Sequence, residues 1–262
     1  MPLNKLNKEN CIKAIQIWNE ARCDYSKISK LIAPFSSFSF SLEDYLWLKH
    51  KNDYSFFHIY VGIHNSKLIL ISVPLNNQGK EKKLDFFIYS SYGPIANNLT
   101  LVEEDTFVTT KKTVLDKNLN VISYCENNNL PINNEPRISQ RASVNDIELW
   151  KNNCMDWFYY ECEKDNGENI FKAFKVPFSD ADMLINDSKY NEIKILFGLK
   201  FSIVYQKSLP NLIFVATHSS GKKDSRIIRG ISVDTPEVMN TQDYSQPCPP
   251  FCRESDDFGL FS

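Results

Sequence analysis

An internal similarity between the two halves of the chain constrains its fold more than any other feature of the sequence. The stretch IAPFSS, which contains Pro34, returns in altered form as KVPFSD, which contains Pro177. When the second half is aligned with the first, Trp18 falls on Trp157, 139 positions later. The chain has only 4 tryptophans, so two of them in matching positions favour duplication of one ancestral unit over chance similarity.

The expected helices repeat together with these residues. Each half begins with an amphipathic helix, and in the second half Ser143 is the predicted N-cap. A short helical segment then ends before Pro34 in one half and before Pro177 in the other, because proline disfavours helix in the residue ahead of it. A further helix is predicted to begin at Ser41 and at Ser179, each followed three residues later by an acid.

Three strands follow in each half and predict an antiparallel meander. Their apolar runs are separated by polar turns, and the pair Asn65-Ser66 is a hairpin signal between the first two. The predicted strands are residues 56–64, 67–73 and 85–92 in the first half and residues 195–204, 211–217 and 226–233 in the second.

These patterns predict an α+β protein of two similar units related by a pseudo-twofold axis. Each unit is expected to be an antiparallel meander sheet with helices packed on one face. The first unit spans residues 1–129 and includes extra strands within 95–129. Residues 130–142 are rich in proline and asparagine and predict a linker, the second unit spans 143–240, and a tail occupies 241–262.

The composition is that of a folded, soluble protein. Hydrophobic residues make up 42%, charged residues 24% and aromatic residues 13%, and the formal net charge is -2. This balance predicts no binding to nucleic acid or to an anionic membrane. No apolar run is long enough to cross a bilayer, and no signal peptide is visible, so we expect a cytoplasmic protein. The 7 cysteines, an odd number, argue against a secreted disulfide framework and favour mostly reduced thiols.

The second unit and the tail carry a resemblance to a known group. Trp157 in the first helix, the pair Phe197-Gly198, the strand at 212–215 and the sequence from Cys248 to Cys252, Cys-Pro-Pro-Phe-Cys, are the residues concerned. Together they resemble a group of small, uncharacterised bacterial proteins about half as long that end in Cys-Pro-Pro-x-Cys. The resemblance implies the fold of the second unit, and it implies no activity.

The two tail cysteines leave three interpretations open. Two prolines favour polyproline II, which puts Cys248 and Cys252 roughly 12 Å apart at about 3.1 Å per residue. That exceeds the ~7 Å limit for a disulfide, so a disulfide or a shared metal needs a sharp turn, such as one made by a cis proline. Zinc needs two further ligands in addition. The tail therefore packs on the surface, binds a metal such as zinc, or serves redox chemistry or partner attachment.

Two basic loop tips are candidate binding sites. The stretch HSSGKKD is not a phosphate-binding P-loop, because Ala216 stands where its first glycine is required and Lys223 where Ser or Thr is required. Both tips are expected to be exposed turns, and as a pair they could bind an anionic partner. The candidate residues are Lys80, Lys82, Lys83, His218, Lys222 and Lys223.

The remaining candidates are histidines and aromatics. His58 and His64 are expected on one partly solvated sheet face, about 20 Å apart at ~3.3 Å per residue, too far to share a metal. The consecutive aromatics at 157–160 predict a helix buried on more than one side or, as the alternative, an aromatic pocket.

No common catalytic motif is present in the sequence. We therefore expect a non-enzymatic binding or scaffold protein without a cofactor, whose partner is another protein. It would act through sheet edges, the cleft between the units or the tail. The alternative is an enzyme, for example a hydrolase, with its site in that cleft.

Overall fold

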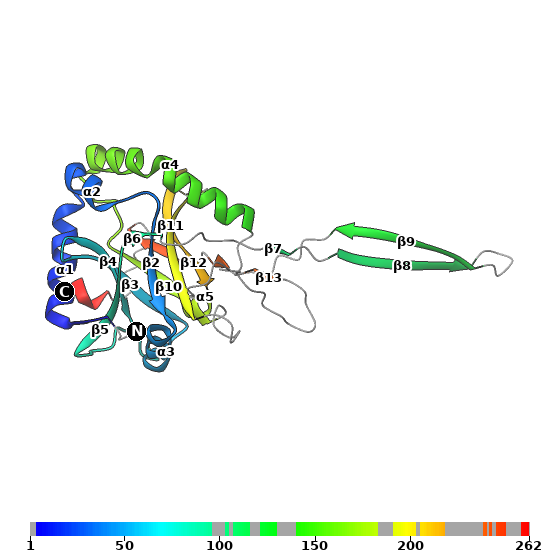
Figure 1. Cartoon of the computed structure of the whole chain (residues 1–262), viewed down its shortest axis with the longest axis horizontal. Coiled ribbons are helices and arrows are strands. Elements are labelled where there is room, and N and C mark those ends of the chain that lie inside the picture. The colour runs from blue at the N-terminus through cyan, green and yellow to red at the C-terminus, as the bar shows by residue number, and fades with distance from the viewer. Residues whose placement is uncertain are drawn as a thin grey trace.

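The protein has an α+β fold built around two antiparallel sheets (Figure 1). The structure is a computed structural model, and it describes residues 4–95, 103–104, 107–115, 121–129, 140–182, 191–202, 205–217, 238–239, 241–242, 245–249 and 258–261.

Each of the two sheets takes strands from both halves of the chain. The larger sheet has the order β1 (Lys5–Asn7), β5 (Phe86–Ser91), β4 (Lys67–Val73), β3 (Phe56–His64), β10 (Ala173–Pro177) and β15 (Gln246–Cys248). The smaller sheet has the order β14 (Thr241–Gln242), β12 (Lys207–Thr217), β11 (Glu192–Ser202), β2 (Ser36–Ser41) and β6 (Gly93–Pro94). The two halves therefore exchange strands, which differs from the expectation that each half would build its own sheet.

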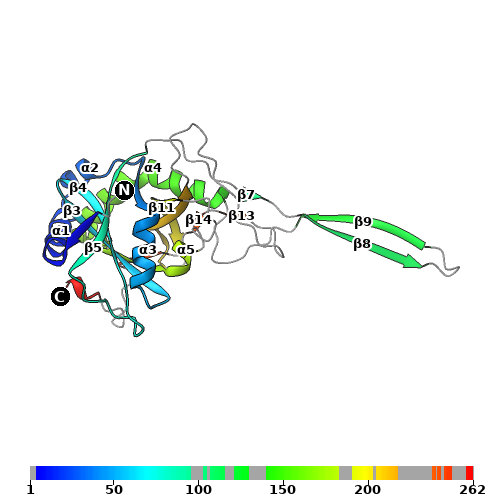
Figure 2. The ribbon, with the colours of Figure 1, turned by 60° about the horizontal axis from the view of Figure 1, so that its bottom comes forward.

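The extra strands predicted between residues 95 and 129 are present. β8 (Phe107–Leu115) pairs with β9 (Val121–Asn129), and the two form a long hairpin that points away from the sheets (Figures 1 and 2). The short strand β7 (Glu103–Glu104) pairs with β13 (Val238–Met239), so this region also contacts the second half of the chain.

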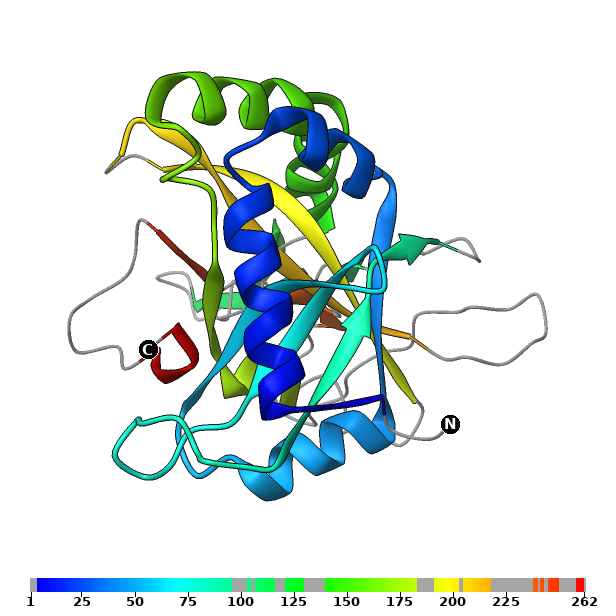
Figure 3. The same cartoon turned by 90° about the vertical axis from the view of Figure 1, so that its left-hand side faces the viewer.

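The helices surround the two sheets. α1 (Lys8–Ala21) lies across the face of the larger sheet, while α2 (Tyr25–Leu31) and α4 (Gln140–Asp165) lie together at one end and α3 (Leu42–Lys51) at the other (Figure 3). α5 (Phe178–Asp182) follows β10, and the 3₁₀ helix η1 (Gly259–Phe261) packs beside α1 (Figure 3).

Capping residues in the sequence account for the starts of the first three helices. Asn7 and Asp24 cap α1 and α2 by accepting hydrogen bonds from backbone N–H groups of the first turn. Ser41 and Asp44 form the reciprocal bonds of a capping box at the start of α3, which confirms the prediction for that helix. α2 ends at Leu31, before Pro34, as predicted.

Two sequence predictions about elements are wrong. α4 begins at Gln140, so Ser143 lies inside the helix and the helix starts within the predicted linker. The segment ahead of Pro177 is strand β10 and not the end of a helix. Residues 36–41 form strand β2, for which the sequence had given no prediction.

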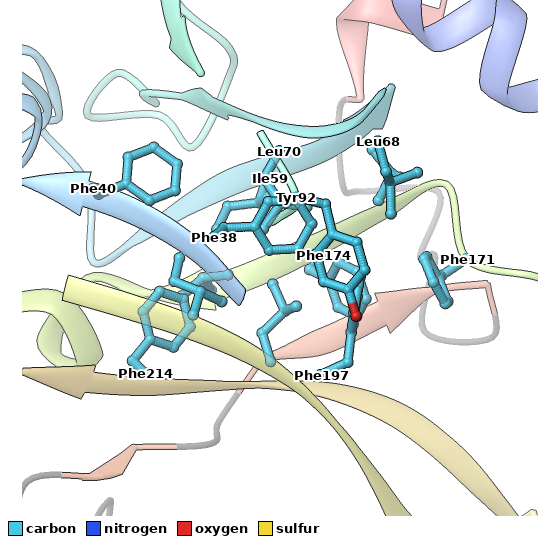
Figure 4. Packing of buried hydrophobic residues seen from close by; sticks show 14 of the residues in the cluster. Phe38, Phe40, Ile59, Leu68, Leu70, Tyr92, Phe171, Phe174, Phe197 and Phe214 are labelled. Carbon is cyan, nitrogen blue, oxygen red and sulfur yellow. The ribbon is translucent and has the colours of Figure 1, made fainter. Parts of the chain in front are cut away.

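The inner faces of the two sheets pack on each other through aromatic and aliphatic side chains (Figure 4). Phe38 of β2 and Phe174 of β10 bring strands of one half against strands of the other. Phe197 of β11 lies among five aromatic rings, with a centroid distance of 4.6 Å to Trp150 and 5.4 Å to Phe171. This cluster is the common core of both halves.

The main helix of each half lies close to its own meander because a glycine faces it. A Cβ on Gly62 of β3 would lie 3.0 Å from the Cβ of Ala14 in α1. A Cβ on Gly198 of β11 would lie 3.2 Å from the Cβ of Asp146 in α4. The absence of a side chain lets each helix approach its strand closely.

A buried arginine also joins the two halves. The Nη1 of Arg22 donates to the carbonyl oxygens of Gly167, Glu168 and Ile170, at 3.2 Å for Glu168 and 3.1 Å for Ile170. Burial lowers the pKa of the Arg22 guanidinium from its ordinary value. The carbonyls compensate part of this desolvation with charge-assisted hydrogen bonds.

The cysteines whose side chains are described are mostly free thiols, and two of them, Cys11 and Cys154, are buried. Cys11, Cys23, Cys154 and Cys162 are free. Burial raises the pKa of Cys11 to about 12 and that of Cys154 to about 11, so both remain protonated and unreactive at neutral pH. Cys248 is disulfide-bonded, which was one of the states that the sequence left open for it.

The predicted aromatic run lies on α4 and is buried on one side only. Phe158 is fully buried and Trp157 is half-buried, whereas Tyr159 and Tyr160 are exposed. The prediction of a helix enclosed on several sides is therefore wrong.

Of the helices in the described ranges, none has the length and apolar character to span a membrane.

Candidate functional site

The loop between β4 and β5, residues 74–85, carries three of the predicted binding lysines, and we call it the lysine loop. It borders a surface hollow of about 560 Å³. Lys80 and Lys83 are exposed, and Lys82 forms an ion pair with Asp53. The hollow is lined by Asn76, Lys80, Glu81, Lys82, Lys83 and Leu84. The structure thus brings Lys80, Lys82 and Lys83 to one place.

Local hydrogen bonds hold the tip of the lysine loop in one conformation. The Asn76 side chain accepts from the backbone N–H groups of Gln78 and Lys80, at 2.9 and 3.0 Å. Gly79 has φ of 78°, a left-handed conformation that glycine adopts without steric cost. Leu75 and Glu81 form an isolated β-bridge across the base of the loop. Asn and Gly at these positions are turn signals that the sequence displays.

Glu81 points inward from the lysine loop, in the opposite sense to its lysine neighbours. Its Oε1 lies 2.8 Å from Nδ1 of His58 and accepts a hydrogen bond from the hydroxyl of Tyr60. The side chain of His58 is 1% exposed and that of Glu81 8% exposed. His58 is therefore buried, and the prediction of a partly solvated position for it is wrong.

The chain from 258 to 261, which we call the 258–261 segment, covers these three side chains. The ring of Phe258 stacks on His58 with centroids 4.2 Å apart and meets Tyr60 edge-on at 5.8 Å. The backbone N–H of Leu260 donates to Oε2 of Glu81 at 3.0 Å. Figure 3 shows η1, in red, beside α1 and next to the lysine loop. We call His58, Tyr60 and Glu81 the Glu81 cluster.

The hydrogen bonds of the Glu81 cluster hold its side chains and the Leu260 backbone in fixed positions. A carboxylate only accepts hydrogen bonds, so Nδ1 of His58 carries the proton that it directs to Glu81. This is how a general base is oriented in hydrolases, but a base also requires an accessible face and a nucleophile within about 3 Å. Phe258 covers His58, and within the described residues no serine or cysteine hydrogen-bonds to it. The cluster can fix a loop and hold a peptide backbone.

The space between the two sheets holds a cavity of about 20 Å³ among apolar side chains. Asp44 and Ser72 are polar residues in its lining, and Oδ1 of Asp44 has no hydrogen-bond partner in the described part of the chain. A volume of this size accommodates one water molecule.

The predicted tail residues are only partly described. Cys248 lies in β15, paired with β10, and its carbonyl accepts from Lys172 N–H at 2.7 Å. The peptide bond from Cys248 to Pro249 is cis, and the Cys248 sulfur is disulfide-bonded. As part of a disulfide, its sulfur is not the thiolate that zinc requires.

The other predicted residues lie outside the described ranges, namely Cys252, His218, Lys222 and Lys223. Over the ranges that are described, no group of three or more His, Cys, Asp or Glu side chains is arranged to hold a metal ion.

Glu81 is the site residue that sequence reasoning missed. Its only signal is one acid among lysines in the sequence GKEKK. The pairing with His58, 23 positions earlier, arises because β3 and β4 are neighbours and the lysine loop folds back over them. A comparison with family models, with curated proteins and with solved structures found no match for the chain.

Proposed function

We propose that this chain is a non-enzymatic binding protein whose lysine loop receives an anionic segment of a partner protein. The observation that carries the proposal is the coincidence of a hollow of about 560 Å³ with outward-pointing lysines. Lys80 and Lys83 are exposed at its rim, while the ion pair with Asp53 offsets the charge of Lys82.

The internal support of the loop favours binding because it lowers the cost of ordering the loop. The Asn76 hydrogen bonds fix the tip of the lysine loop. The contact of Glu81 with His58 of β3 holds the loop against the sheet. A surface that is already in its bound conformation loses less entropy on association.

The expected affinity is modest and sensitive to salt. Exposed charge pairs contribute about 0.2–1 kcal/mol each, and salt screens them. Replacing both exposed lysines, in Lys80→Ala/Lys83→Ala, should weaken binding of a labelled poly-glutamate peptide about three- to tenfold. Fluorescence anisotropy at low and at physiological salt measures this change.

The matched control is Lys30→Ala/Lys67→Ala, which removes two exposed lysines from α2 and from the start of β4. It lowers the net charge of the protein by the same amount. An equal loss of affinity in both double variants would mean that only overall charge matters, and the proposed site would be abandoned.

The enzymatic alternative has less support. The cavity between the sheets has about 20 Å³, too small for a substrate, and the base-like His58 is covered by Phe258. The described residues favour a binding role.

We further propose that the two halves arose by duplication of one unit and exchanged strands. Ser41 of β2 pairs with Glu192 of β11, and Phe56 of β3 pairs with Pro177 of β10. A shift of 136 positions takes Ser41 to Pro177 and Phe56 to Glu192. The pairing of Ser41 with Glu192 and the pairing of Pro177 with Phe56 are therefore equivalent under this shift. The same shift maps Gly62 onto the helix-facing Gly198.

This correspondence differs from the one predicted from sequence. The strand pairing relates Pro177 to Ser41, whereas the sequence alignment related Pro177 to Pro34. An experimental structure tests the proposal by superposition of residues 36–64 on 172–200. If Gly62 and Gly198 then fell at different positions relative to α1 and α4, the proposed duplication would be rejected.

A further inference from the structure

The 258–261 segment occupies a surface that has the features of a peptide-binding site. Two side chains anchor it, since Phe258 stacks on His58 and Leu260 is 6% exposed. Between them the chain is held through its backbone, because Glu81 accepts from the Leu260 N–H.

Leu260 lies among apolar side chains, which we call the Leu260 seat, and most of them belong to the first half of the chain. Leu260 packs in a buried cluster with residues of β1, α1, β3, β4 and β5. This cluster includes Leu6, Cys11, Ala14, Ile15, Tyr60, Ile69, Ile71 and Phe87. The site therefore combines an aromatic stacking position, a backbone acceptor and an apolar seat two residues further along.

These three elements are a recognised way to bind a peptide. Backbone hydrogen bonds supply affinity for any sequence, while side-chain pockets select particular residues. The spacing selects an aromatic residue at one position and leucine two positions later. The contacts are made by side chains on strands and on a loop whose tip is held by the Asn76 hydrogen bonds.

Charged residues that adjoin these contacts in the sequence extend this selectivity. In the sequence, Phe258 follows directly on Glu254, Ser255, Asp256 and Asp257. In the lysine loop, the exposed Lys80 directly precedes Glu81. An acidic stretch joined to the aromatic anchor thus complements a basic loop joined to its acceptor, and such complementarity sets partner choice.

We infer that the Glu81 cluster and the Leu260 seat form a peptide-binding site for a partner segment with acidic residues followed by an aromatic residue and, two positions later, leucine. The 258–261 segment is its ligand in cis and blocks it. The lysine part of this inference rests on the proposed function, because the same loop receives the acidic residues. Binding in trans requires displacement of the 258–261 segment, so the free chain is autoinhibited.

The test uses the full chain and a labelled peptide of residues 254–262, ESDDFGLFS. The variant Phe258→Ala/Leu260→Ala loosens the cis segment. It should bind the peptide at least about tenfold more tightly than the unchanged chain does, since each lost anchor normally contributes more than 1 kcal/mol to affinity. A peptide with alanine in place of Phe258 and Leu260 should bind the loosened variant more weakly by the same factor. Equal, weak binding by both proteins would overturn the inference.

Two further measurements distinguish a failure of the lysine loop from a failure of the Leu260 seat. Adding Lys80→Ala/Lys83→Ala to the loosened variant should lower peptide affinity about three- to tenfold. If the peptide binds but these lysines have no effect, the lysine loop has no role and the proposed function fails while the seat stands. If poly-glutamate binding depends on the lysines but the peptide does not bind, the seat fails and the proposed function stands.

A measurement on the unchanged chain covers the case in which the variant does not fold. The Leu260 amide is protected by its hydrogen bond to Glu81. Excess unlabelled peptide should displace the 258–261 segment and speed hydrogen exchange at this amide about tenfold or more, whereas the alanine peptide should not. Unchanged exchange with both peptides would overturn the inference.

Discussion

Replacing Phe197 by alanine should lower the free energy of unfolding by about 3–5 kcal/mol, the range for large-to-small changes of a buried aromatic residue. Phe197 is 1% exposed and lies at the centre of the contact between the two sheets. The rings around it come from β2, β10, α4 and two connecting segments, and belong to Phe38, Tyr92, Trp150, Phe171 and Phe174. The substitution leaves a cavity that such a set of large rings, fixed on separate elements, fills poorly.

The matched control is Phe201→Ala in the same strand. Phe201 is 57% exposed, so the same chemical change should cost less than about 0.5 kcal/mol. Urea denaturation followed by circular dichroism gives both values. Equal losses in the two variants, or a loss below about 1 kcal/mol for Phe197→Ala, would contradict a core shared by the two sheets.

Replacing Gly167 by alanine should cost about 3 kcal/mol of stability, the sum of two effects. Gly167 has φ of 72°, which costs an L-residue roughly 1–2 kcal/mol. The added Cβ would also overlap the Arg22 carbonyl oxygen and lie 2.9 Å from the Cα of Cys23, and such overpacking costs typically 1–3 kcal/mol. Both neighbours are backbone atoms and cannot turn aside as the end of a side chain can.

Gly79→Ala carries the first effect alone, so the difference between the two variants measures the second. Gly79 has φ of 78°, but its nearest neighbours are atoms of the partly exposed Tyr54 ring, at 3.3 Å. It should cost only about 1–2 kcal/mol. Thermal unfolding by calorimetry compares the two variants. If Gly167→Ala were no worse than Gly79→Ala, the close approach of residues 166–170 to Arg22 would not contribute to stability.

The sites of these two substitutions show how the halves are joined. Phe197 stabilises the sheets where they face each other, and Gly167 allows the 166–170 turn to bring its carbonyls to the Arg22 guanidinium. Phe38 and Tyr92, which contact Phe197, lie more than 100 positions from it in the sequence, and so does Arg22 from Gly167. We therefore expect the two halves to unfold together.

Local patterns predicted much of the secondary structure. The strands at 56–64 and 67–73 coincide with β3 and β4, because a positive φ at Asn65 and Ser66 and an apolar run on each side specify a hairpin without distant contacts. The capping box at Ser41 is likewise local. The exposed position of Lys80 and Lys83 follows from the turn in which they lie.

The strands β2 and β10 were missed for a physical reason. SSFSFS and AFKVP are short, and nothing within either segment specifies its hydrogen-bonding partner. They become strands because β11 and β3 of the opposite half offer free backbone groups at their edges. Strand formation depends on such pairing far more than on local preference.

By itself, the sequence determined where α1, α2 and α3 begin, the hairpin of β3 and β4, and that three lysines share one exposed loop, since each of these depends on residues a few positions apart. The tertiary structure alone decided which half supplies each strand to a sheet, the inward turn of Glu81 to His58 and Tyr60, and the docking of Leu260 on Glu81. These depend on contacts between residues 21 to 179 positions apart, and no local pattern encodes them, because the energy that selects them comes from burial and pairing after the chain has folded.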